Sequence, residues 1–180
     1  MLSTERPVGD NFSRFVMAKK VELSLKEGDK APDFSVLDNN SARVSLKDFK
    51  GKPIVLYFYP KDDTPGCTKE ACAFRDGYSN FRKVGAVVLG VSTDPVKSHQ
   101  KFVDKFSLPF QLLSDDEKKI VGSYGVWGEK SFMGRKYMGT HRVTFLIDGS
   151  GRIAKIWPEV KPEQHATEVL DAIKALSVRE

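Results

Sequence analysis

Short apolar runs recur along the chain and predict the strands of a β-sheet. The most uniform of them, residues 54–59, reads IVLYFY and ends at Pro60. An unbroken apolar run of this length is typical of a strand covered on both faces, so we expect it in the interior of the sheet. Three further apolar runs are predicted as strands: residues 84–91, 110–113 and 142–148.

Amphipathic segments follow these runs and predict helices. Between residues 67 and 83 the apolar side chains recur at intervals of three and four, which gives one helical face. The other predicted helices are residues 95–106, 116–124 and 162–176. Strands therefore alternate with helices, which is the pattern of parallel β/α units.

Turn residues predict two antiparallel hairpins beside the parallel units. Residues 38–40 join the strands 34–37 and 43–46, and residues 148–151 join the strands 142–148 and 152–157. Parallel units combined with hairpins and a closing helix predict an α/β fold of thioredoxin-like type, with a central mixed β-sheet flanked by α-helices.

Length and composition predict one domain. A chain of 180 residues with 40% hydrophobic residues can bury a large core without crosslinks. Residues 1–20 mix proline, glycine, asparagine, serine and charges, so we expect a flexible N-terminal tail there and the domain at residues 21–180.

The same composition argues against several partners and sites. No apolar run approaches the 18 residues of a membrane span, and the net charge of +5 is spread without long basic runs, so neither a membrane nor a nucleic acid is expected. Two cysteines cannot form a secreted disulfide framework, which favours a cytoplasmic location. The three histidines lack metal-ligand spacing, so we expect no metal.

Cys67 is the residue with the clearest chemistry. It follows a turn-rich stretch, residues 60–66, at the point where helix-forming residues resume. Backbone N–H groups and the positive end of the helix dipole meet at a helix N-terminus, and both stabilise a thiolate.

Cys72, the second cysteine, lies five residues further along. In an intact helix this spacing separates the two Cα atoms by roughly 8.6 Å, whereas a disulfide needs about 4.4–6.8 Å. Cys67 and Cys72 can therefore pair only if the helix between them unwinds. We interpret them as a redox couple, with two unrelated thiols as the alternative of about equal weight on spacing alone.

Residues around Cys67 resemble those of peroxiredoxins. Pro60, Thr64 and Cys67 match the signature Pro-x-x-x-Thr-x-x-Cys of that family, and the run DTPGCTKEAC at residues 63–72 resembles the branch of the bacterioferritin comigratory protein and peroxiredoxin Q. The resemblance covers about residues 22–178, including APDF at 31–34 and RVTFLID at 142–148.

The resemblance implies a function for both thiols. Cys67 would be the peroxidatic nucleophile that reduces hydrogen peroxide or an organic hydroperoxide and becomes a sulfenic acid. Cys72 would be the resolving cysteine that forms an intrachain disulfide, which thioredoxin or a similar dithiol donor would reduce. No cofactor is needed, and because the resolving thiol is internal we expect a monomer.

Four further residues are candidates for the site through the same resemblance. Arg142 and Thr64 would donate hydrogen bonds to the peroxide or the thiolate, and Pro60 would shield the thiolate from water. Thr64 could also cap the helix, a role that is compatible with the first and that would be favoured without the signature, and Pro60 could simply end the strand. Glu70 either anchors Arg142 or simply favours the helix N-terminus.

Two other functions remain open from the sequence. A general thiol-disulfide oxidoreductase would use the same fold, although its usual Cys-x-x-Cys pair has a shorter spacing. A non-catalytic binding module would not need the thiols. The sequence does not rank the peroxides that the chain would reduce.

Overall fold

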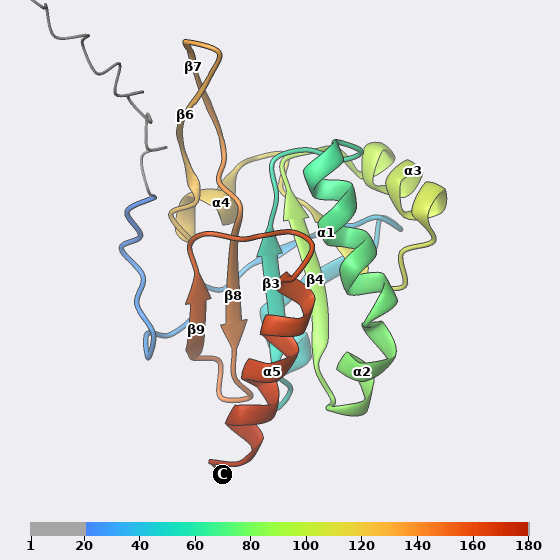
Figure 1. Cartoon of the computed structure of the whole chain (residues 1–180), viewed down its shortest axis with the longest axis vertical. Coiled ribbons are helices and arrows are strands. Elements are labelled where there is room, and N and C mark those ends of the chain that lie inside the picture. The colour runs from blue at the N-terminus through green and yellow to red at the C-terminus, as the bar shows by residue number, and fades with distance from the viewer. Residues whose placement is uncertain (1–20, 180) are drawn as a thin grey trace, which may run out of the picture.

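A seven-stranded mixed sheet forms the centre of the computed structural model, which describes residues 21–179 (Figure 1). The predicted tail at residues 1–20 lies outside this range. The strand order is β2-β1-β5-β4-β3-β8-β9, in which β3 pairs in parallel with β4 and β4 with β5. The strands are β1 (Ser35–Asp38), β2 (Arg43–Ser45), β3 (Ile54–Phe58), β4 (Val87–Ser92), β5 (Gln111–Ser114), β8 (Val143–Ile147) and β9 (Ile153–Trp157).

Strand β3 is covered on both faces, as its unbroken apolar run predicts. Its side chains alternate between two apolar clusters: Leu56 and Phe58 belong to one cluster, and Val55 and Tyr57 to the other. The neighbours of β3 are β4 on one side and the antiparallel β8 on the other. The strand that precedes Cys67 is therefore an interior strand, and its C-terminal end is rigidly placed.

Helices cover both faces of the sheet. The cluster around Tyr57 includes Phe74 of α1, Phe81 of α2 and Phe102 of α3, and in Figure 1 α1, α2 and α5 lie in front of the sheet. The opposite face carries the 3-10 helix η1 and α4, which lies behind the sheet. The helices are η1 (Leu46–Phe49), α1 (Pro65–Asp76), α2 (Tyr78–Lys83), α3 (Val96–Phe106), α4 (Lys119–Ser123) and α5 (His165–Ser177).

The predicted α/β class, the mixed sheet and both hairpins are confirmed, but three helices differ from the expectation. The last helix, expected from residue 162, begins at His165, after a turn that contains Pro162. The helix expected over residues 67–83 is two helices separated by Gly77, the residue type that is least favourable in a helix after proline. The helix expected over residues 116–124 is shorter, because Lys118 has a left-handed conformation with φ +58° and α4 begins only after it.

Strands β6 (Trp127–Phe132) and β7 (Arg135–Thr140) form a separate hairpin that the sequence analysis left unassigned. The hairpin projects from the body of the domain in Figure 1. Its two turn residues, Met133 and Gly134, both have positive φ, which matches the twist of a two-residue β-turn. The hairpin leads directly into residues 141–142, so its base lies next to Arg142.

The helices of the described part of the chain are short. Between residues 21 and 179, none of them has the length and the apolar character that a membrane crossing requires.

Candidate active site

The loop after β3 delivers Cys67 to the first turn of α1. The helix begins at Pro65, with Thr64 in the N-cap position, so Cys67 is its third residue. Only 2% of Cys67 is exposed. Because the N–H groups of a first helical turn have no partners within the helix, they are available to an anion at this place.

Arg142 joins Cys67 to Glu70. Its Nη2 atom donates a hydrogen bond to Cys67 Sγ at 3.3 Å, and its Nη1 atom donates to Glu70 Oε2. Glu70 lies one turn after Cys67 in α1 and is completely buried, whereas the Arg142 side chain is 21% exposed. A buried carboxylate thus fixes one arm of the guanidinium while the other arm faces the thiol.

Gly66 leaves room for this guanidinium. A Cβ atom at position 66 would lie 3.0 Å from Arg142 Nη2, closer than an ordinary van der Waals contact. A side chain there would therefore press on the arm of Arg142 that bonds Cys67.

Burial and the ion pair act in opposite directions on Glu70. Burial raises the pKa of Glu70 to about 7, and Arg142 opposes this rise. For Arg142, burial acts to lower the pKa, but Glu70 and Cys67 outweigh it and the pKa is raised. The guanidinium therefore stays charged, while Glu70 changes its protonation near neutral pH.

Thr64 and Pro60 lie in the loop that joins β3 to α1. Thr64 occupies the N-cap position of α1, as the capping alternative predicts, but its hydroxyl donates to the carbonyl oxygen of Lys61 at 2.8 Å and makes no capping bond to the helix. An oxygen that donates in this direction keeps lone pairs that can accept from an incoming ligand. Pro60 is half-buried directly after Tyr59, in the turn that follows β3.

Cys72 lies on the same helix as Cys67 and is half-buried; both are free thiols. Because α1 is intact from Pro65 to Asp76, the ideal helical separation of roughly 8.6 Å between their Cα atoms applies. The described conformation is thus one in which the two thiols cannot bond.

Two residues near the site were missed by the sequence analysis. Lys130 of β6 donates to the Thr140 carbonyl at 3.0 Å, and its pKa is lowered by burial and by Arg142. Burial also raises the pKa of Tyr57, whose hydroxyl has no partner among the described residues. In the sequence Tyr57 resembles any other apolar strand residue, and the hairpin that carries Lys130 was not predicted. Neither residue could therefore be recognised as part of the site from the sequence.

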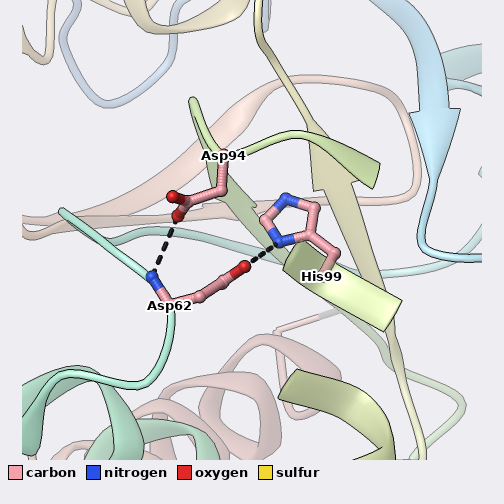
Figure 2. A group of neighbouring side chains, drawn as sticks. All are labelled: Asp62, Asp94 and His99. Carbon is pink, nitrogen blue, oxygen red and sulfur yellow. Dashed lines mark hydrogen bonds and ion pairs between the residues drawn. The ribbon is translucent and has the colours of Figure 1, made fainter. Parts of the chain in front are cut away.

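Only one group of side chains in residues 21–179 has the arrangement of metal ligands. Ligand atoms of Asp62, Asp94 and His99 lie within 4.8 Å of one another (Figure 2). Each of these side chains already bonds to a protein partner, and His99 Nδ1 lies 2.7 Å from Asp62 Oδ2. We therefore interpret the group as a hydrogen-bonded network.

Comparison with known proteins identifies the family. Residues 27–156 match the model of the AhpC/TSA family. Peroxiredoxin Bcp of Bacillus subtilis is 48% identical over 155 residues, which cover 86% of this chain and 99% of that protein. Peroxiredoxin Bcp of Escherichia coli is 46% identical over 150 residues, which cover 83% and 96%. The chain belongs to the AhpC/TSA family and is a peroxiredoxin.

Solved structures of other peroxiredoxins share the fold. A PrxQ variant of Xylella fastidiosa superposes with a TM-score of 0.81 at 36% identity and covers 85% of this chain and 98% of its own. The bacterioferritin comigratory protein of Xanthomonas campestris, studied for alkyl peroxide reduction, gives a TM-score of 0.78 at 36% identity, with coverage of 87% and 99%. The predicted thioredoxin-like fold is confirmed, and this peroxiredoxin is a thiol-dependent peroxidase.

Proposed function

We propose that Cys67 is the peroxidatic cysteine of this peroxiredoxin. The observation that carries the proposal is the contact between Arg142 Nη2 and Cys67 Sγ at 3.3 Å, held from behind by the buried Glu70. A fixed, permanently charged donor beside a thiol at a helix N-terminus stabilises the thiolate and the charge that develops on a departing oxygen.

The first step is a two-electron transfer from sulfur to the peroxide. The Cys67 thiolate attacks one oxygen of ROOH, the O–O bond breaks, and the second oxygen leaves with a proton as water or an alcohol. Cys67 becomes a sulfenic acid and the peroxide is reduced. Arg142 holds the reacting oxygens beside the sulfur, the Thr64 hydroxyl accepts from the peroxide, and Pro60 limits the access of water.

In the second step Cys72 resolves the sulfenic acid, which allows the catalytic cycle to close. The Cys72 thiol attacks the sulfenic sulfur, water leaves, and a Cys67–Cys72 disulfide forms after the first turns of α1 unwind. Thioredoxin or a similar dithiol then transfers two electrons and two protons to restore both thiols. Since resolution is internal, we propose that the protein acts as a monomer, in the cytoplasm, through the domain at residues 21–180.

A coupled assay tests this function. Thioredoxin, its reductase and NADPH are mixed with the protein and either hydrogen peroxide or an organic hydroperoxide, and the oxidation of NADPH is followed. We expect turnover with the wild type and none with Cys67→Ser, since serine offers no comparable anion. Insulin reduction without peroxide is the control for a general oxidoreductase. Turnover that survives in Cys67→Ser would overturn the proposal.

A further inference from the structure

The Asp62 carboxylate, five residues before Cys67, sits in a buried network that the reaction above does not use. Its side chain is 4% exposed and bonds three groups from two elements. Tyr59 donates to Oδ1 at 2.6 Å, Ser98 donates to Oδ2 at 2.7 Å, and His99 Nδ1 lies 2.7 Å from Oδ2. Asp62 is thereby bonded both to Tyr59, directly after β3, and to the first turn of α3.

His99 bonds Asp62 through one ring nitrogen and the main chain of β5 through the other. The other ring nitrogen of His99, Nε2, lies 3.0 Å from the Leu113 carbonyl oxygen, which can only accept, so Nε2 carries a hydrogen. The contact between Nδ1 and Oδ2 then requires a second hydrogen, on one atom or the other. His99 is completely buried, so this short bond is shielded from water. The Tyr59 hydroxyl also lies near this bond, 3.4 Å from Nδ1.

The backbone of Asp62 is fixed as well. Its N–H donates to Asp94 Oδ2 at 2.9 Å (Figure 2). The Ser92 hydroxyl donates to the same oxygen at 2.6 Å. The next residue, Asp63, has φ +55°, a left-handed conformation that a residue with a side chain adopts at a cost. The strained turn thus begins at a residue that is held by both its side chain and its main chain.

The network lies directly before the reactive segment. Thr64 follows Asp62 by two residues, and α1 begins one residue later, where the first helical turn has few bonds of its own. We propose that the buried Asp62–His99 pair is a positioning device, which holds the loop of residues 60–65 so that Thr64 and Cys67 keep their reactive arrangement. This inference rests on the proposed function for its catalytic consequence, whereas the anchoring itself is independent of it.

The pair also sets a boundary for the unwinding of α1. On the C-terminal side, Phe74 is completely buried against Tyr57 and anchors the helix. On the N-terminal side, Asp62 is the last residue before Cys67 whose side chain is held by buried hydrogen bonds. The segment that rearranges when Cys67 and Cys72 join is therefore confined to about residues 63–73, and the loop returns to one place after reduction.

Asp62→Ala tests the inference, with Asp38→Ala as the matched control. Asp38 is also a buried carboxylate, which accepts hydrogen bonds from Asn40, Ala42 and Gln111 at the β1–β2 turn, far along the sheet order from β3. In the reduced protein we expect two bonded amides, that of Thr68, which donates to the Thr64 carbonyl, and that of residue 62, which donates to Asp94 Oδ2, to exchange about tenfold faster in Asp62→Ala than in the wild type, and to be unchanged in Asp38→Ala.

The rate of Cys67 oxidation is the second readout. In stopped-flow experiments with hydrogen peroxide we expect Asp62→Ala to lower the second-order rate constant about tenfold, and Asp38→Ala to leave it within about twofold of the wild type. Asp62→Asn should recover most of the rate, because its amide can donate to Nδ1 of a neutral His99 while its oxygen still accepts from Tyr59.

Ser98→Ala removes only one of the three bonds and keeps the test valid if Asp62→Ala does not fold. We expect faster exchange in the same amides, by about threefold. The inference is overturned if these amides keep wild-type protection in Ser98→Ala and Asp62→Ala, or if Asp62→Asn is as slow as Asp62→Ala. Failure of the proposed function has a different signature: wild-type Cys67 would not react with peroxide, while the exchange comparison would stand.

Discussion

Replacing Glu70 by glutamine should change how the stability of the protein depends on pH. Glu70 is completely buried, and burial raises its pKa from 4.5 to about 7 against the opposing effect of Arg142. In the unfolded chain the same carboxyl ionises near its ordinary value. The folded protein therefore binds more protons than the unfolded chain between these two pH values.

The sign and the size follow from this difference. An acid whose pKa is raised on folding contributes most to stability at low pH, and the contribution falls as the pH rises from about 4.5 to about 7. A pKa difference of about 2.5 corresponds to about 3 kcal/mol, of which about 2 kcal/mol is lost between pH 5 and pH 7. Glutamine does not titrate, so Glu70→Gln should not show this loss of stability between pH 5 and pH 7.

Urea unfolding at several pH values from 5 to 8 measures the effect. Both proteins should carry Cys67→Ser, so that the thiol beside Arg142 cannot be oxidised during the measurement. We expect the stability of Glu70→Gln to rise relative to its parent by about 2 kcal/mol between pH 5 and pH 7 and to level off above that.

Glu163→Gln is the control for this experiment. Glu163 is also paired with a cation, Lys69, but its side chain is 74% exposed, so its replacement should leave the pH dependence unchanged. The claim that burial dominates the pKa of Glu70 would be refuted if the stability of Glu70→Gln relative to its parent did not change with pH, or if it fell as the pH rose.

Three further results are expected. Arg142→Lys should slow Cys67 oxidation about tenfold or more in stopped-flow traces with little change in stability, because lysine lacks the fork of donors; an unchanged rate constant would remove Arg142 from the site. Cys72→Ser should keep the first fast phase and stop at the sulfenic acid, whereas loss of that phase would reverse the two roles. Amides of residues 68–74 should exchange faster in the disulfide form than in the reduced form; equal protection would exclude unwinding of α1.

The main elements of the fold could be predicted from the sequence where the local pattern is determined by burial. Strand β3 is apolar at every position because both of its faces are covered. Cys67 could be placed in a first helical turn because proline, glycine and the preceding turn residues mark the start of α1. The break at Gly77 was missed, since amphipathic periodicity continues across a break when both pieces face the same core. The late start of α4 was missed because the acids at residues 115–117 are typical of a helix N-terminus, whereas Lys118 has a left-handed conformation.

The contacts between distant residues could not be predicted in the same way. Arg142 bonds Cys67 across 75 positions of sequence, and an arginine at the end of a strand is usually just solvated. Glu70 was ambiguous because an acid near a helix N-terminus is favourable with or without an arginine partner. In the sequence Asp62 resembles an ordinary loop residue and His99 an ordinary helix residue. They are 37 positions apart, and only the fold brings them together in a buried contact.

Peptide mapping of the oxidised protein tests the central claim most directly. Trypsin cleaves after Lys69 and so separates Cys67, in residues 62–69, from Cys72, in residues 70–75. After one equivalent of hydrogen peroxide, mass spectrometry without reduction should show these two peptides joined by one disulfide. Two copies of the peptide of residues 62–69 joined to each other, or an oxidised Cys72 with Cys67 still reduced, would contradict the assignment of Cys67 as the nucleophile that Cys72 resolves.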